Sequence, residues 1–181
     1  MRLRKLKQEL GDRLSIRWRA FPLRPVPDPT VTFKGTYRED AWRRCQALAG
    51  DAGVEFRLWE REDFPTSSLP ALEAAKCAAL QGEEAFERLH LALYRAFFTR
   101  GINIGVADEV LEVVRETGLD MERFQADYET GKAREWVLAD YEEAVRTHGV
   151  RAIPTVLFDG KRIVGAVPLE EYRRLLTAAE A

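Results

Sequence analysis

Two thiols and a proline-containing loop are the parts of this chain best suited to chemistry. Cys45 and Cys77 are the only cysteines. Their spacing fits neither a Cys-x-x-Cys redox pair nor a set of zinc ligands. Both fall in helical patterns, where a small, buried apolar side chain is the expected role. A disulfide between them is the minor alternative, because the chain looks cytosolic and disulfides are rare in that compartment.

The loop Ile153-Pro154-Thr155, called the proline loop below, follows Gly149 and opens an apolar run that reverses at Asp159-Gly160. An Asp-Gly pair is typical of a type I′ turn, so the run is predicted to be the first strand of a hairpin. A proline at the start of a strand is tolerated only where the ladder does not need its missing N–H. Since X-Pro bonds are the common site of cis peptides, we predict a cis Ile153–Pro154 bond.

Other titratable side chains have ordinary structural explanations. His90 lies on a predicted helix beside aromatic residues and is expected to be packed and hydrogen-bonded. His148 is expected to interact with the C-terminal end of a helix. Because it is close to the proline loop, an influence on a site there stays open. Asp140, Glu142 and Glu143 are expected to form a solvated helix face rather than an acid/base pair.

The composition describes a globular protein of 181 residues, with 46% hydrophobic and 32% charged residues and a net charge of −2. This length suits one domain or a domain with an insertion. No extended cluster of Lys and Arg suggests a nucleic-acid partner, and no apolar run is long enough to span a membrane. The charged N-terminal segment does not read as a secretory signal, so a cytoplasmic location is expected.

Apolar periodicity predicts a helix–strand start, a long helical block, and a hairpin–helix end. Four prolines between residues 22 and 29 predict an extended loop after the first strand. Val54 to Leu58 is either a short strand or an extended link. Helices are predicted at 1–10, 38–49, 69–81, 83–98, 107–117, 120–130, 132–148 and 168–179, with a strand at 14–21.

This order resembles the thioredoxin fold of the DsbA family, and the cytoplasmic FrnE-like branch is the most similar. The proline loop is the most specific element of the resemblance, which extends over nearly the whole chain. The remaining elements are Trp18 to Pro25, Ala79-Leu80-Gln81-Gly82, Phe97-Phe98 with Ile102-Asn103-Ile104, Gly118-Leu119-Asp120 and Gly165-Ala166-Val167-Pro168. The expected fold is therefore α/β and thioredoxin-like, with a thioredoxin-like domain at 1–36 and 149–181 and a helical insertion at 37–148.

The resemblance implies a thiol–disulfide oxidoreductase that acts on protein or small thiols and needs no cofactor. In the family, a Cys-x-x-Cys pair lies at the N-terminus of the first helix, where the helix dipole lowers the thiol pKa. The resemblance further implies that the backbone of Ile153 pairs with the substrate chain. Pro154 would hold the shape of the loop, and Thr155 would lie against the site.

This sequence begins within the first helix of the family pattern, so the first β-strand and the Cys-x-x-Cys pair are missing from it. Without that central strand, two strand edges carry unpaired backbone groups. In order of preference, we expect a start codon assigned too late, a degenerate gene copy, or a strand supplied by another chain. A homo-oligomer through the open edges is one form of the last account. The chain as given is expected to be inactive in dithiol chemistry.

The alternative function is that of a redox-inactive thioredoxin-fold protein that binds peptide or glutathione. Thr66-Ser67-Ser68 falls where glutathione-using relatives often carry an Asn-Ser or Asn-Thr segment. Thr66 departs from that pattern. The segment is therefore interpreted first as the start of a helix.

Overall fold

The computed structural model describes residues 1–49 and 55–179 and divides the chain into two compact units. Unit 1 consists of Met1–Arg19 and Glu142–Ala181, and unit 2 consists of Ala20–Tyr141. The domain boundaries expected from the sequence, at 36/37 and 148/149, stay a prediction.

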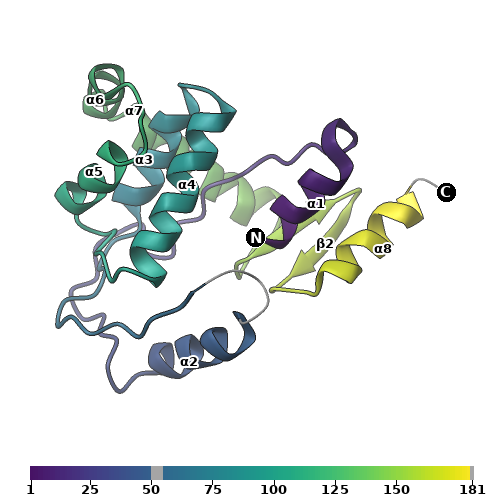
Figure 1. Ribbon diagram of the computed structural model, residues 1–181, viewed down its shortest axis with the longest axis horizontal. Coiled ribbons are helices and arrows are strands. Elements are labelled where there is room, and N and C mark those ends of the chain that lie inside the picture. The colour runs from purple at the N-terminus through teal and green to yellow at the C-terminus, as the bar shows by residue number, and fades with distance from the viewer. Residues whose placement is uncertain (50–54, 180–181) are drawn as a thin grey trace. The chain divides into compact units, whose positions relative to one another are not determined.

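Unit 1 is a hairpin with helices from the two ends of the chain (Figure 1). Strands β1 (Thr155–Phe158) and β2 (Lys161–Val164) pair antiparallel, with Val156 opposite Ile163. At the turn Asp159 and Gly160 have φ values of 46° and 70°, as a type I′ turn requires. Helix α1 (Arg2–Leu10) packs against α8 (Leu169–Ala179).

The segment predicted as a strand at residues 14–21 is not one. Its side chains alternate between half-buried and exposed, and Leu14 has extended backbone angles. A strand, however, also needs a neighbouring backbone to complete its ladder of hydrogen bonds. The described residues form a two-stranded sheet of β1 and β2 alone, which does not include this segment. The alternating pattern thus indicates an extended conformation, but it does not by itself predict that the segment pairs with another strand.

Unit 2 is helical. Its helices are α2 (Tyr37–Ala49), α3 (Leu69–Ala79), α4 (Glu83–Phe98), α5 (Ala107–Arg115), α6 (Met121–Glu129) and α7 (Lys132–Glu142), whose last residue belongs to unit 1. Helices α3 to α6 enclose the larger core, in which Cys77, Leu89 and Phe124 are fully buried. A separate aromatic cluster surrounds Trp42, whose ring centroid lies 5.0 Å from those of both Phe97 and Phe98.

The predicted helices are all present, and the differences lie at their ends. The segment predicted as one helix at 132–148 continues beyond α7 as a π-helical turn, η3 (Glu143–Thr147). Residues 55–58 are an extended link, held at the end of α4 by a 2.8 Å hydrogen bond from Arg57 N–H to the Phe98 carbonyl. Val54, the first residue of the segment predicted as a strand or a link, lies outside the described residues.

Candidate functional site: the proline loop and the outer edge of β1

The proline loop is exposed and is held from both sides by hydrogen bonds within unit 1. The Ile153–Pro154 peptide bond is cis, and Ile153 is 45% exposed. The Thr155 hydroxyl donates to the Ala152 carbonyl at 2.6 Å, which closes the loop on itself. The preceding turn is held from β2, because Arg162 Nη1 donates to the carbonyls of His148 and Gly149, each at 3.0 Å.

The pairing of β1 with β2 determines which backbone groups face outward. Gly165 N–H donates to the Pro154 carbonyl at 2.8 Å, so these two residues form a hydrogen-bonded pair. In an antiparallel ladder such pairs alternate with non-hydrogen-bonded ones. With the observed register, Thr155 and Leu157 therefore direct their N–H and C=O groups away from β2. Among the described residues no strand pairs with this outer edge of β1.

Apolar side chains are exposed beside this edge. Leu157 is 46% exposed and Val164, opposite Thr155, is 54% exposed. Their side chains lie on the same face of the hairpin, since cross-strand neighbours share a face. An extended polypeptide added to β1 would gain main-chain hydrogen bonds along the edge and apolar contact on this face. The geometry thus offers a site for a strand.

The two cysteines lie in different environments, and neither has formed a disulfide. Cys77 is fully buried in the core of unit 2, and this burial raises the pKa of its thiol to about 12. The expectation of burial was wrong for Cys45, which is exposed on α2. Trp42, one turn earlier on the same helix, is the residue that packs into the aromatic cluster.

His90 is packed and His148 lies at a helix end, as expected, and the hydrogen bond of His90 stays a prediction. The His90 ring lies between aromatic rings of the same helix, with centroid distances of 4.9 Å to Phe86 and 4.8 Å to Tyr94. His148 follows the last residue of η3 and donates its backbone N–H to the Glu143 carbonyl. Its Nε2 atom lies 3.7 Å from a carboxylate oxygen of Glu143.

Asp140 is not part of a solvated face, which corrects the sequence-based expectation. Its side chain is 7% exposed and accepts the Ala20 N–H at 2.8 Å and the Lys76 ammonium at 2.5 Å. Glu142 and Glu143 are exposed, as expected. Periodicity could not reveal the difference, because the partners of Asp140 lie 120 and 64 residues away in the sequence.

The hydroxyl segment Thr66-Ser67-Ser68 precedes α3, in agreement with its interpretation as a helix start. Ser67 Oγ accepts the Leu69 N–H at 3.2 Å. Ser68 instead fixes the proline-rich loop, because its Oγ accepts the Arg24 N–H at 3.0 Å and its own N–H donates to the Arg24 carbonyl. These contacts give two of the hydroxyls a structural use.

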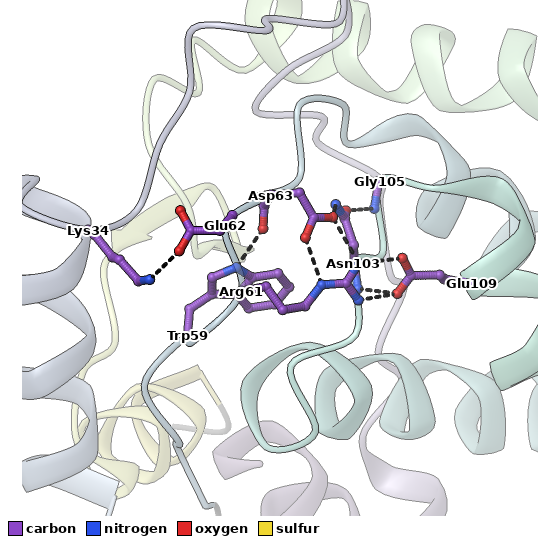
Figure 2. A network of polar contacts seen from close by, with 8 residues as sticks. All are labelled: Lys34, Trp59, Arg61, Glu62, Asp63, Asn103, Gly105 and Glu109. Carbon is purple, nitrogen blue, oxygen red and sulfur yellow. Dashed lines mark hydrogen bonds and ion pairs between the residues drawn. The ribbon is translucent and has the colours of Figure 1, made fainter.

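A polar network in unit 2 was missed by the sequence analysis (Figure 2). Arg61 forms two hydrogen bonds to Glu109, at 2.6 and 2.8 Å, and two to Asp63, at 2.7 and 2.9 Å. Asn103, 4% exposed, donates from Nδ2 to Asp63 and receives the Gly105 N–H at Oδ1. The network ties the 59–63 segment to the start of α5, which indicates a structural role. No local motif links Arg61 to a carboxylate 48 residues away.

Within residues 1–49 and 55–179 no group of three His, Cys, Asp or Glu side chains is placed to hold a metal ion. In the same part of the chain no helix has both the length and the apolar character needed to span a bilayer.

Curated relatives are similar at low identity. The ClpXP adapter protein SpxH of Bacillus subtilis is 26% identical over 178 residues, which cover 91% of this chain but 59% of that protein. SpxH of Halalkalibacterium halodurans is also 26% identical, over 80% of this chain and 50% of its own length. The chain therefore spans little more than half of these adapters. YwbO of Bacillus subtilis is 23% identical, over 92% of this chain and 83% of its own length.

A solved structure has the same fold. It is that of a candidate protein disulfide isomerase from Nitrosomonas europaea, with a TM-score of 0.77 and 19% identity over 98% of this chain and 87% of its own. At that identity the likeness shows the thioredoxin-like fold alone, and it confirms the fold class expected from the sequence. Residues 1–177 match the family described as the DSBA-like thioredoxin domain, and the chain therefore belongs to that family.

Proposed function

We propose that this chain is the substrate-binding part of a cytoplasmic thiol–disulfide oxidoreductase of the DsbA type, in the FrnE-like branch. The observation that carries the proposal is the exposed proline loop at the start of the outer edge of β1, with which no strand of residues 1–49 and 55–179 pairs. Family membership supplies the class of chemistry. Protein thiols are the proposed substrates, because a protein segment can pair with a strand edge through its backbone.

In the proposed complex the substrate lies extended beside β1. The backbone of Ile153 pairs with it at the proline loop, and the outward N–H and C=O groups of Thr155 and Leu157 continue the pairing. Pro154, which has no N–H to offer, is placed where its carbonyl is already used by Gly165. The substrate's backbone, rather than its side chains, would thus determine where its sulfur lies.

The redox cysteines of the proposed enzyme are not among these 181 residues. Thiol–disulfide exchange requires an accessible thiolate. Cys77 is fully buried with a thiol pKa near 12, and Cys45 has no second cysteine next to it in the sequence. We expect no insulin-reductase activity from this chain. Activity above the buffer level that persists in a variant with Cys45→Ser and Cys77→Ser would contradict this assignment.

The genomic sequence upstream of the codon for Met1 tests the oxidoreductase directly. A reading frame that continues upstream into a strand followed by Cys-x-x-Cys would support it, and the longer protein should then reduce insulin. An in-frame stop codon immediately upstream would contradict it.

The second candidate is a redox-inactive member of the fold that binds polypeptides, as the adapter proteins among the relatives suggest. The observation that favours it is the same open edge, since strand addition needs no cysteine. An upstream stop codon combined with retained peptide binding would support this candidate. Glutathione binding has no comparable support, because the hydroxyls of Ser67 and Ser68 are used in backbone contacts.

Binding to the outer edge of β1 is common to both candidates and can be tested on this chain. Leu157→Pro removes an N–H that points outward, so the hairpin should stay folded while peptide binding falls by at least about tenfold. Val164→Pro is the matched control. It also removes an outward N–H from an exposed position, but from the edge of β2. Equal losses of binding in the two variants, with circular dichroism unchanged, would place the peptide elsewhere.

A further inference from the structure

Charge is divided unequally between the two units. Unit 1 contains thirteen Lys and Arg residues against eight Asp and Glu, so it carries +5. Unit 2 contains fifteen basic against twenty-two acidic residues and carries −7. The near-neutral total of −2 hides this division. The unit that contains the proline loop is thus the basic one. Its positive charge would favour a partner of negative charge.

Most acidic residues of unit 1 are already engaged. Arg173 donates a hydrogen bond from Nε to the Glu9 carboxylate at 3.1 Å. Glu142 pairs with Arg146 and Glu171 with Arg174. Glu143 also pairs with Arg19, and Glu170 with Arg173.

Several basic residues of unit 1 donate to neutral groups instead. A backbone carbonyl satisfies the N–H donors of a cation without cancelling its charge. Arg2 donates to the Ala166 carbonyl at 3.2 Å, and Lys7 donates to the Leu14 carbonyl at 2.8 Å. Arg162 donates to the His148 carbonyl in the same way. The positive charge of these groups is therefore left to act on a partner.

The segment that carries the proposed site is itself rich in basic residues. Between Gly149 and Gly165 the sequence has three basic residues, Arg151, Lys161 and Arg162, and one acid, Asp159, at the turn. Arg151 is exposed two residues before Ile153, and no ion pair is found for it in the described part of the chain. A strand that runs along β1 to the proline loop would come close to this guanidinium.

We propose that the occupant of the outer edge of β1 is an acidic polypeptide segment, selected by the positive charge of unit 1. This inference rests on the proposed function, because it names the partner of the same edge. The backbone of the segment pairs with β1, and its Asp and Glu side chains lie in the positive field around Arg151. Such electrostatic selection weakens as salt screens exposed charges.

Three labelled peptides of equal length and equal Val and Thr content test this proposal on the 181-residue chain. Their outward positions carry Glu, Ser or Lys, and binding is followed by fluorescence anisotropy. We expect the Glu peptide to bind most tightly, and its advantage to shrink between about 0.05 and 0.5 M salt. Arg151→Glu should weaken the Glu peptide about three- to tenfold and leave the Ser peptide nearly unchanged.

Arg44→Glu is the matched control, since it changes the net charge equally on an exposed position of α2 in unit 2. It should leave all three affinities unchanged. Equal affinities for the three peptides, all reduced by Leu157→Pro, would overturn the charge selection and leave the proposed function standing. Binding of none of them would overturn both. A single-stranded DNA that binds more tightly than the Glu peptide would overturn the choice of a polypeptide.

Discussion

Substitution of Asp140 tests which buried polar contacts stabilise the fold of this chain. Asp140 is a buried carboxylate near the end of α7, and it connects two segments that are distant in the sequence. Its Oδ2 atom accepts the N–H of Ala20, where unit 2 begins, and the ammonium of Lys76 on α3. We predict that Asp140→Ala strongly destabilises unit 2, whereas Asp140→Asn has a smaller effect.

The two contacts set the size of the effect. Alanine leaves the Ala20 N–H without its partner, and an unsatisfied buried donor costs about 1–3 kcal/mol. The Lys76 side chain is 21% exposed, so water compensates part of the lost ion pair, which adds about 1 kcal/mol. The expected loss for Asp140→Ala is therefore about 2–4 kcal/mol. Asparagine can still accept the Ala20 N–H, and its expected loss is about 1 kcal/mol.

Urea denaturation followed by far-ultraviolet circular dichroism measures these losses as shifts of the transition midpoint at constant slope. Glu142→Ala is the control, because Glu142 is an exposed acid two residues later whose partner is Arg146 on the surface. It should cost less than about 0.5 kcal/mol. An Asp140→Ala variant as stable as Glu142→Ala would refute the reasoning. Equal losses for Asp140→Ala and Asp140→Asn would show that the Ala20 contact contributes little.

Two further predictions concern titration and thiol reactivity. Hydrogen bonds from Arg61 lower the pKa of Asp63 and Glu109 from their ordinary values of 3.8 and 4.5. The stabilisation from each carboxylate is therefore present above its ordinary pKa and is lost as the pH falls below that value. Acid denaturation should show this loss, and Arg61→Gln should reduce it, whereas an unchanged acid profile would contradict the link. Native protein treated with iodoacetamide at mildly alkaline pH should be modified at exposed Cys45 and not at buried Cys77, whose burial raises its pKa to about 12. Mass spectrometry would show this, and equal native labelling would be the contrary result.

The sequence predicted the local structure well because helices and turns depend on neighbouring residues. The predicted helices appear with small shifts at their ends. Gly11, with a φ of 54°, ends α1 directly after the predicted range of 1–10. The Asp159-Gly160 turn has the positive φ values that its residue types favour. The proline loop could be found for the same reason, since it is a contiguous motif at the start of a strand.

The tertiary structure decided what depends on distant partners. The alternating segment at 14–21 fits a strand, but pairing needs a neighbour that no local pattern supplies. Asp140 was expected to be solvated and is buried, whereas Cys45 was expected to be buried and is exposed. Neither could be predicted locally, because burial is set by packing between helices. The Arg61 network and the separation of charge between the units also appear only when residues far apart in sequence are brought together. The sequence by itself thus determined where the proline loop lies. Folding determined that the loop leads to an edge of β1 with which no strand of the described residues pairs, and that this edge belongs to a basic unit.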